Sequence, residues 1–230
     1  MATLSYHEID FPAVTARKIT SILKSPVFNP LISSPELIID RESGSLHSPR
    51  YSIHPIDLRS LELSCKPPKG VDPSLPTLFI SECCLIYLSP PEADNILKWA
   101  TQDFSSAVGV ILYEPIGGDD AFGKVMIQNL AARGIVLKTL KKYSSLARQT
   151  ERLRLLGFAH GHAAADVAFI HDNWVDEGER ERIARLEMLD EVEEWQLLAR
   201  HYCIAWGWRE DAGGVFEGWK EGFPTPGRQG

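Results

Sequence analysis

The sequence predicts an α/β fold, and three observations support this prediction. Near-continuous apolar runs at 77–88 and 108–116 are typical of buried strands, the first of a strand covered on both faces. A helical pattern at 89–104 lies between them, and strand, helix and strand at this spacing favour parallel pairing through a right-handed crossover. Twelve of the 15 prolines precede Glu92, which places strands and loops in the first half and mostly helices in the second.

The elements follow one another from the amino end. A short strand at 4–10 leads into a helix at 11–23, which Pro12 opens in its first turn. Proline and serine clusters predict surface loops at 25–50 and 62–76, with a strand at 51–58 between them. The remaining predicted elements are helices at 89–104, 120–133, 144–156 and 178–200, and strands at 77–88, 108–116 and 202–208. The glycine-containing segment 209–230 is predicted to be a disordered tail.

Composition restricts the classes of function. The 230 residues, 44% of them hydrophobic, suffice for one soluble globular domain. A formal charge of -7 weighs against binding to a nucleic-acid backbone. The four cysteines form no C-x-x-C pair, which favours a reduced, cytoplasmic compartment. Since no apolar stretch reaches about 20 residues and the amino end lacks the regions of a signal peptide, we predict no membrane partner.

Acidic side chains lie within or at the ends of four of the predicted strands. They are Asp10, Asp57, Glu82 and Glu114. In open α/β sheets ligands bind beyond the carboxyl ends of the strands, so these carboxylates are predicted to converge on one crevice that suits hydroxyl, amine or cationic groups. Asp10 could equally cap the following helix, and Asp57 could simply end its strand. Glu82 stands inside an apolar run, where an acidic group is costly unless it serves a site.

Other chemistry has less support. His160 and His162 have no evident partners for a metal, so no metal site is predicted. Neither Ser81 nor Cys83 lies in a G-x-S-x-G nucleophile motif. The glycines that follow residue 116 do not have the G-x-G-x-x-G spacing of a phosphate-binding loop.

Four segments resemble the leucine carboxyl methyltransferase family, in the same order: YHEIDFPAVTARK, ISECCLIYLSP, YEPIGGDDAFGKVMIQNL and LEMLDEVEEWQLLARHYCIAW. The resemblance covers roughly residues 4–208. It implies a Rossmann-like methyltransferase fold with added helices in the carboxyl-terminal half. It also implies S-adenosylmethionine as methyl donor, and methyl esterification of the C-terminal leucine carboxylate of the protein phosphatase 2A catalytic subunit.

The resemblance also assigns roles to individual residues. Asp10 in EIDFP matches the acidic residue that binds the ribose hydroxyls. Asp57 and Leu58 in IDLR match the pair beside the adenine, and Glu82 in SECCL matches a glutamate that contacts the cofactor. Glu114 has no such match and remains a candidate from the strand pattern alone. The residues assigned to the substrate side are Tyr113, Asp120, Phe122 and Asn129.

The sequence departs from the family pattern at its start. Only nine residues precede Asp10, too few for the strand and Gly-rich loop that the family places before it. We therefore expect residues 1–208 to form a partial methyltransferase domain that begins at strand two, with an uncovered sheet edge and weak or absent donor binding. Two alternatives stay open: a non-catalytic isoform that only binds the phosphatase, and the related methyltransferase of wybutosine synthesis in transfer RNA.

The implied reaction needs no catalytic triad. A C-terminal carboxyl group has an ordinary pKa of about 3.3–3.7, so it is ionised at pH 7 without a general base. Methyl transfer to it would depend on positioning and on the exclusion of water. No catalytic residue is therefore assigned from the sequence.

Overall fold

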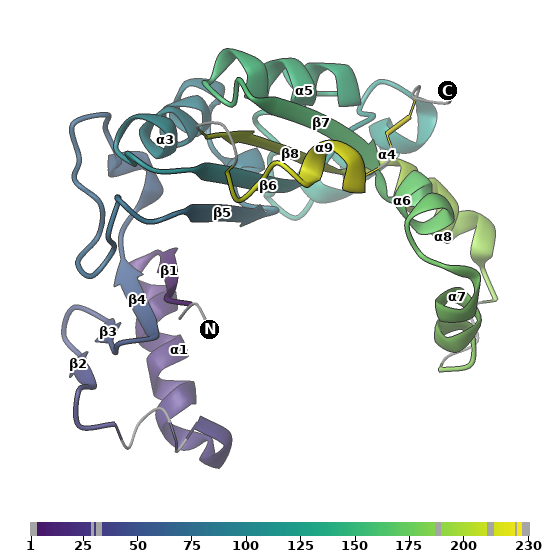
Figure 1. Ribbon diagram of the computed structural model, residues 1–230. Coiled ribbons are helices and arrows are strands. Elements are labelled where there is room, and N and C mark those ends of the chain that lie inside the picture. The colour runs from purple at the N-terminus through teal and green to yellow at the C-terminus, as the bar shows by residue number, and fades with distance from the viewer. Residues whose placement is uncertain are drawn as a thin grey trace. The chain divides into compact units, whose positions relative to one another are not determined.

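The computed structural model describes residues 4–28, 30, 34–186, 190–210, 214–223 and 225–226. The chain forms two compact units, the first ending at Pro73 and the second beginning at Ser74, and each is described by itself (Figure 1). None of the helices in the described part of the chain combines the length and apolar character needed to cross a membrane.

The first unit is a four-stranded sheet with one long helix. Its strands, in spatial order, are β1 (Tyr6–Asp10), β4 (Tyr51–Pro55), β3 (Ser45–His47) and β2 (Ile38–Asp40). Strand β1 pairs with β4 in parallel, and the other pairs are antiparallel. Helix α1 (Pro12–Lys24) buries Ile19 and Ile22 against Leu46 and Ile53 of the sheet. The short 3-10 helices η1 (Pro26–Phe28) and η2 (Leu58–Ser60) complete the unit.

Strands β2 and β3 fall in the segment 25–50, which was predicted to be a surface loop, and that prediction is wrong there. The two strands have three residues each and are joined through Gly44, whose φ of 76° suits a turn. Strands this short carry too few alternating residues to be recognised from a pattern.

The second unit contains a mixed four-stranded sheet in the order β5, β6, β8, β7. Strands β5 (Thr77–Glu82) and β6 (Val108–Pro115) are parallel and are joined through α3 (Pro90–Gln102). Strand β8 (Tyr202–Arg209) is antiparallel to both β6 and β7 (Gly161–Asp166). Both sheets thus contain a parallel pair joined through a helix, and the predicted α/β class is confirmed.

The apolar run 77–88 is not one doubly covered strand, as the sequence predicted. The strand ends at Glu82, and the remaining residues form a turn and the 3-10 helix η3 (Leu85–Tyr87). Leu78 and Ile80 are 42% and 66% exposed. The reason is that β5 is an edge strand of the described sheet, and apolarity alone does not mark where a strand gives way to a helical turn.

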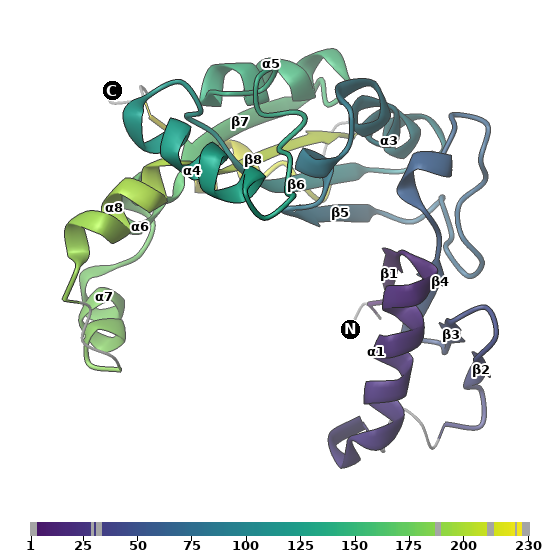
Figure 2. The same cartoon turned by 180° about the vertical axis from the view of Figure 1, so that it is seen from behind.

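The rest of the second unit is largely helical. Helix α5 (Leu146–Leu155) contacts β7 and β8, as Figures 1 and 2 show. The predicted helix 178–200 is two helices, with residues 187–189 outside the described part of the chain. Strand β7 was not predicted because its sequence, GHAAAD, has no β-branched residue. The other helices are α4 (Ala121–Ala131), α6 (Val167–Asn173), α7 (Glu177–Ala184), α8 (Val192–Arg200) and α9 (Trp219–Gly222).

Part of the segment predicted to be a disordered tail packs on this sheet. Phe216 is buried against Trp206 and Trp208, and α9 follows it. Gly109 leaves room for this contact, because a Cβ there would lie 2.7 Å from the Phe216 ring.

Candidate functional site

Asp10 and Asp57 lie at the same edge of the first unit's sheet. Asp10 is the last residue of β1, and Asp57 follows the end of β4, the parallel neighbour of β1. The backbone N–H of Ile56 donates to the carbonyl of Asp10 at 3.0 Å, which ties the two strand ends together. The Asp10 carboxylate is exposed and accepts a 2.7 Å bond from the N–H of Phe11.

Asp57 also has a local structural role. It is the N-cap of η2 and accepts from the backbone N–H of Arg59 at 3.0 Å. The Arg59 side chain binds both its oxygens, and these bonds hold the pKa of Asp57 below its usual value. Leu58, the other residue assigned to the adenine, begins η2 and is half-buried.

In the second unit, Glu82 ends β5 with its side chain exposed. The next residue, Cys83, has a φ of 44°, and it is the only described residue other than glycine with a positive φ. Its N–H donates to the carbonyl of Tyr113 at 2.8 Å, which holds this left-handed turn against β6. A non-glycine residue in this conformation is strained, and such strain is concentrated at functional sites.

Tyrosine rings and thiols surround this turn. Tyr113 of β6 stacks on Tyr202, the first residue of β8, with ring centroids 5.4 Å apart. Burial, then the nearby Cys83 thiol, raises the pKa of Tyr113 and of Tyr202. Burial likewise raises the pKa of Cys83, and that of Cys203 to about 12. These groups therefore stay neutral near pH 7, and neither cysteine has the low pKa of a nucleophilic thiol.

Asp120 and Phe122 meet a buried histidine. His201 is 4% exposed, and its ring lies 4.4 Å from that of Phe122. Its Nε2 lies 2.9 Å from Oδ2 of Asp120, and its Nδ1 lies 2.7 Å from the carbonyl oxygen of Leu197. Because both nitrogens face oxygen acceptors, both contacts are hydrogen bonds only when the ring carries two protons. Asn129 lies two turns further along α4 and is exposed.

Glycines let the loop before α4 approach His201 closely. Gly117 has a φ of 75°, and a Cβ there would lie 2.7 Å from Cδ2 of His201. At Gly123 a Cβ would lie 2.0 Å from the carbonyl oxygen of Gly117. Asp120 accepts from the N–H of Gly123 at 2.8 Å, and this bond, with His201, lowers the Asp120 pKa. These glycines thus serve packing, in agreement with the absence of a phosphate-loop spacing.

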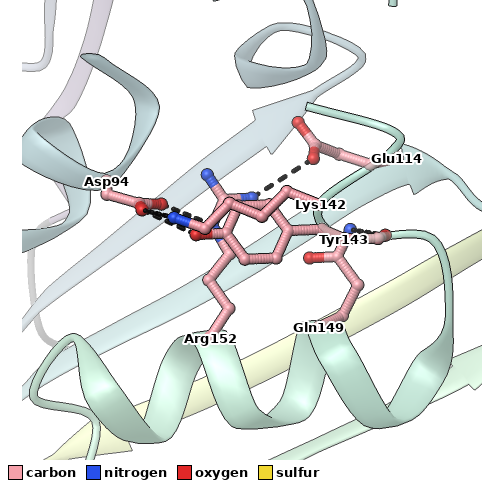
Figure 3. A network of polar contacts seen from close by, with 6 residues as sticks. All are labelled: Asp94, Glu114, Lys142, Tyr143, Gln149 and Arg152. Carbon is pink, nitrogen blue, oxygen red and sulfur yellow. Dashed lines mark hydrogen bonds and ion pairs between the residues drawn. The ribbon is translucent and has the colours of Figure 1, made fainter. Parts of the chain in front are cut away.

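Glu114 does not join the side chains that gather at the carboxyl ends of β5 and β6. It is fully buried, and its Oε2 lies 3.4 Å from Nη1 of Arg152, which is also buried. Arg152 reaches Asp94 as well, with its Nε 3.1 Å from Oδ1 (Figure 3). The prediction that Glu114 joins the other strand-end carboxylates is therefore wrong. The charge is compensated by a helix α5 residue that the strand pattern could not reveal.

The network around Arg152 joins three elements. Asp94 of α3 also accepts from the Tyr143 hydroxyl at 2.6 Å and from Lys142 at 2.9 Å. The Arg152 guanidinium lies 4.2 Å from the centre of the Tyr143 ring. Burial raises the pKa of Glu114, although the Arg152 charge opposes this effect. The arrangement packs α3 and α5 against β6 and offers no open site.

His160 and His162 make structural contacts. His162 Nδ1 lies 3.1 Å from the carbonyl of Phe158, and His160 Nδ1 accepts from the N–H of Glu210 at 3.3 Å. Within the described ranges, no group of three or more His, Cys, Asp or Glu side chains could hold a metal ion.

The structure brings Glu82 and Tyr113 together by register, and Asp120 and Phe122 through His201. Sequence reasoning missed His201 and Tyr202. They are adjacent at the start of β8, and because β8 is antiparallel, its first residues reach the edge where β6 ends. A strand direction opposite to that of its neighbours was the information needed to find them.

Comparisons with known proteins agree with the resemblance. A family model described as leucine carboxyl methyltransferase matches residues 1–101. Leucine carboxyl methyltransferase 1 of Aspergillus fumigatus is 51% identical over 247 residues, which cover 95% of this chain and 62% of that protein. Its counterpart in Emericella nidulans is 47% identical, with 93% of this chain and 60% of the relative covered. The chain belongs to the leucine carboxyl methyltransferase family.

The chain thus spans about three fifths of the length of these family members. Among solved structures, Haemonchus contortus phosphoethanolamine N-methyltransferase 2 with bound S-adenosylhomocysteine aligns with a TM-score of 0.44 at 12% identity. That alignment covers 92% of this chain and 51% of the other.

Proposed function

We propose that this chain serves S-adenosylmethionine-dependent methyl transfer to the C-terminal leucine carboxylate of the protein phosphatase 2A catalytic subunit. Family membership supports the type of reaction. The observation that carries the proposal lies at the carboxyl ends of β5 and β6. There the exposed Glu82 is paired in register with Tyr113, whose ring stacks on Tyr202. The four cysteines are free thiols, which fits the reducing cytoplasm as the place of action.

This edge suits a cationic donor that carries hydroxyl groups. Glu82 can accept hydrogen bonds from hydroxyls, and neutral tyrosine faces attract cations. When bound, S-adenosylmethionine supplies an electrophilic methyl group. A thiolate beside that group would compete for it, and burial prevents this by keeping Cys83 and Cys203 protonated.

The family resemblance extends the proposal to further residues. Asp10, Asp57 and Leu58 of the first unit are also proposed as donor contacts, because the resemblance assigns them this role. The exposed Asp10 carboxylate has free accepting capacity for hydroxyls, whereas Arg59 already occupies both oxygens of Asp57. The proposed substrate-side residues are Tyr113, Asp120, Phe122 and Asn129.

The chain's own residues position the reactants. A leucine carboxylate is already ionised near pH 7, so no residue has to remove a proton from it. The turn at Cys83, which is hydrogen-bonded to the Tyr113 carbonyl, directs Glu82, and the His201–Asp120 contact holds the start of α4. Preorganised geometry of this kind is the main contribution that such a reaction requires.

The proposal is tested by methyl transfer from labelled donor to a peptide ending in leucine, with the same peptide as its C-terminal amide for comparison. We expect base-labile label on the free carboxylate only. Glu82→Gln should lower the rate about 10- to 100-fold, because a charge-assisted hydrogen bond is lost. Glu193→Gln, an exposed glutamate of α8, is the matched control.

Two results would overturn the proposal. Equal labelling of the amide would exclude the carboxylate as acceptor. Donor binding without any transfer to the peptide would instead favour a protein that acts only by binding the phosphatase.

A further inference from the structure

A pocket beside α4 is lined by none of the residues to which a role is assigned above. It has a volume of about 330 Å³ and lies between α4 and the residues that follow this helix. Figure 2 shows α4 in teal. Its apolar walls are Ile127, Ala131, Ile135, Val136, Leu137 and Leu140. This volume is near the lower limit for ligand sites, so the pocket fits one or two side chains better than a whole cofactor.

The walls of this pocket are open to solvent on one side. Val136 is 61% exposed and Ile127 is 36% exposed, whereas Leu140 is buried and forms the floor. Val125, nearby on α4, is 54% exposed. Apolar side chains gathered around a concave surface mark binding sites more often than single exposed residues do.

The charge of this region is opposite to that of the whole protein. Residues 117–157 contain eight basic and three acidic side chains, although the chain carries a net charge of -7. Three of the basic side chains, Lys142, Arg152 and Arg154, are paired with carboxylates. Lys141 and the exposed Asp119 both line the pocket itself, and Lys138 adjoins the wall residue Leu137. Within the described part of the chain, the exposed Lys124, Arg133, Lys138 and Lys141 make no ion pair.

We propose that this surface, the α4 pocket, binds an acidic peptide segment that inserts a branched apolar side chain between Ile127 and Val136. Charge complementarity selects the acidic flanks, and burial of the inserted side chain supplies the affinity. The pocket is a docking surface for a partner protein, and it goes beyond the methyl-transfer site because its walls include none of the residues proposed to touch donor or acceptor.

A nucleic acid fits this surface less well. Proteins that bind single strands combine basic grooves with aromatic platforms on which the bases stack. The pocket lining contains no aromatic side chain. Its walls are aliphatic, which matches leucine, isoleucine or valine.

Fluorescence anisotropy tests the proposal with three labelled peptides: a leucine flanked by aspartates, the same peptide with serine in place of leucine, and the same peptide with lysines in place of aspartates. We expect saturable, salt-sensitive binding of the first peptide alone. Val136→Asp should weaken it at least about 10-fold, because a carboxylate then lines the apolar cavity and repels the acidic flanks. Lys141→Glu should weaken it about 3- to 10-fold.

Matched controls separate docking from general effects. Val27→Asp changes a valine that is 80% exposed in the other unit, and Lys66→Glu reverses an exposed charge there. Both should bind the first peptide like wild type. Equal loss in the controls, binding of the lysine peptide, displacement by a single-stranded oligonucleotide, or no binding of the first peptide would each overturn the proposal. Dissociation of a homodimer by Val136→Asp in sedimentation would do so too, because the pocket would then be a self-interface.

Discussion

Replacing Arg152 should be among the most damaging single changes in the second unit. Its guanidinium is fully buried between two carboxylates, 3.4 Å from Glu114 and 3.1 Å from Asp94. Arg152→Met leaves Glu114, which is also fully buried, without its cation. Removing one partner of such a pair costs about 3–5 kcal/mol of unfolding free energy.

The reverse change should cost much less. Glu114→Gln keeps the shape of the side chain and leaves Arg152 paired with Asp94, so we expect a loss of about 1–2 kcal/mol. A double variant, Glu114→Leu with Arg152→Met, should recover part of the single Arg152→Met loss, since an apolar pair can replace a buried ion pair at little cost.

The pH dependence of unfolding stability further tests the role of Arg152 beside Glu114. Burial raises the pKa of Glu114 in the folded state, so the folded chain holds that proton more tightly than the unfolded chain. Stability from this group is therefore greatest below its ordinary pKa of 4.5 and is lost as pH rises through the folded value. In Arg152→Met no cation opposes the rise of the Glu114 pKa, so Glu114 is protonated at a higher pH than in wild type. The difference in unfolding free energy between Arg152→Met and wild type should therefore become smaller from pH 7 to pH 5.

Urea unfolding followed by tryptophan fluorescence measures these differences. All six tryptophans lie in the second unit, so the emission reports on that unit alone. An Arg152→Met loss no larger than the Glu114→Gln loss, or a gap that is the same at both pH values, would refute the reasoning.

Three further predictions follow from strain, titration and close packing. Cys83→Gly should leave unfolding stability unchanged or raise it by about 0.5–1 kcal/mol, and Cys83→Val should lower it by about 1–2 kcal/mol; urea melts giving the opposite order would disprove strain at φ 44°. Burial lowers the pKa of His54 from 6.5 to about 4, so the first unit should lose stability as pH falls from 6.5 to about 4. In His54→Gln, the stability measured by hydrogen exchange of the β4 amides should depend less steeply on pH than in wild type. The same pH dependence in both proteins would contradict this prediction. Gly117→Ala should cost about 1–3 kcal/mol in urea unfolding, partly relieved in a background of His201→Ala, whereas strictly additive losses would exclude the clash.

The sequence predicted the elements whose patterns are local. Pro12 marks the start of α1, and Ser89 with Glu92 forms the capping box of α3, so both helices begin within a residue of their predicted positions. Asp10 was correctly placed at the end of its strand, because a polar residue after an apolar run marks that point, whereas Glu82 was expected inside a longer strand and in fact ends β5.

Features that depend on distant partners could not be predicted in this way. The role of Glu114 is set by Arg152, which is 38 positions away on a helix, and nothing near Glu114 announces it. Likewise, His201 and Tyr202 reach the candidate site only because β8 runs antiparallel to β6. Local sequence patterns predict the helix or strand in which a side chain lies, whereas its contacts depend on elements that are distant in the sequence.

The most direct test of the donor site is a titration of the isotope-labelled chain with S-adenosylhomocysteine, followed by amide chemical shifts. This measurement detects binding even when it is weak, as the sequence leads us to expect. The account predicts saturable shifts that are largest at Glu82–Cys84, Tyr113 and Tyr202, and that Glu82→Gln weakens but Glu193→Gln does not. Shifts confined to other parts of the chain, or the same affinity in Glu82→Gln as in wild type, would contradict it.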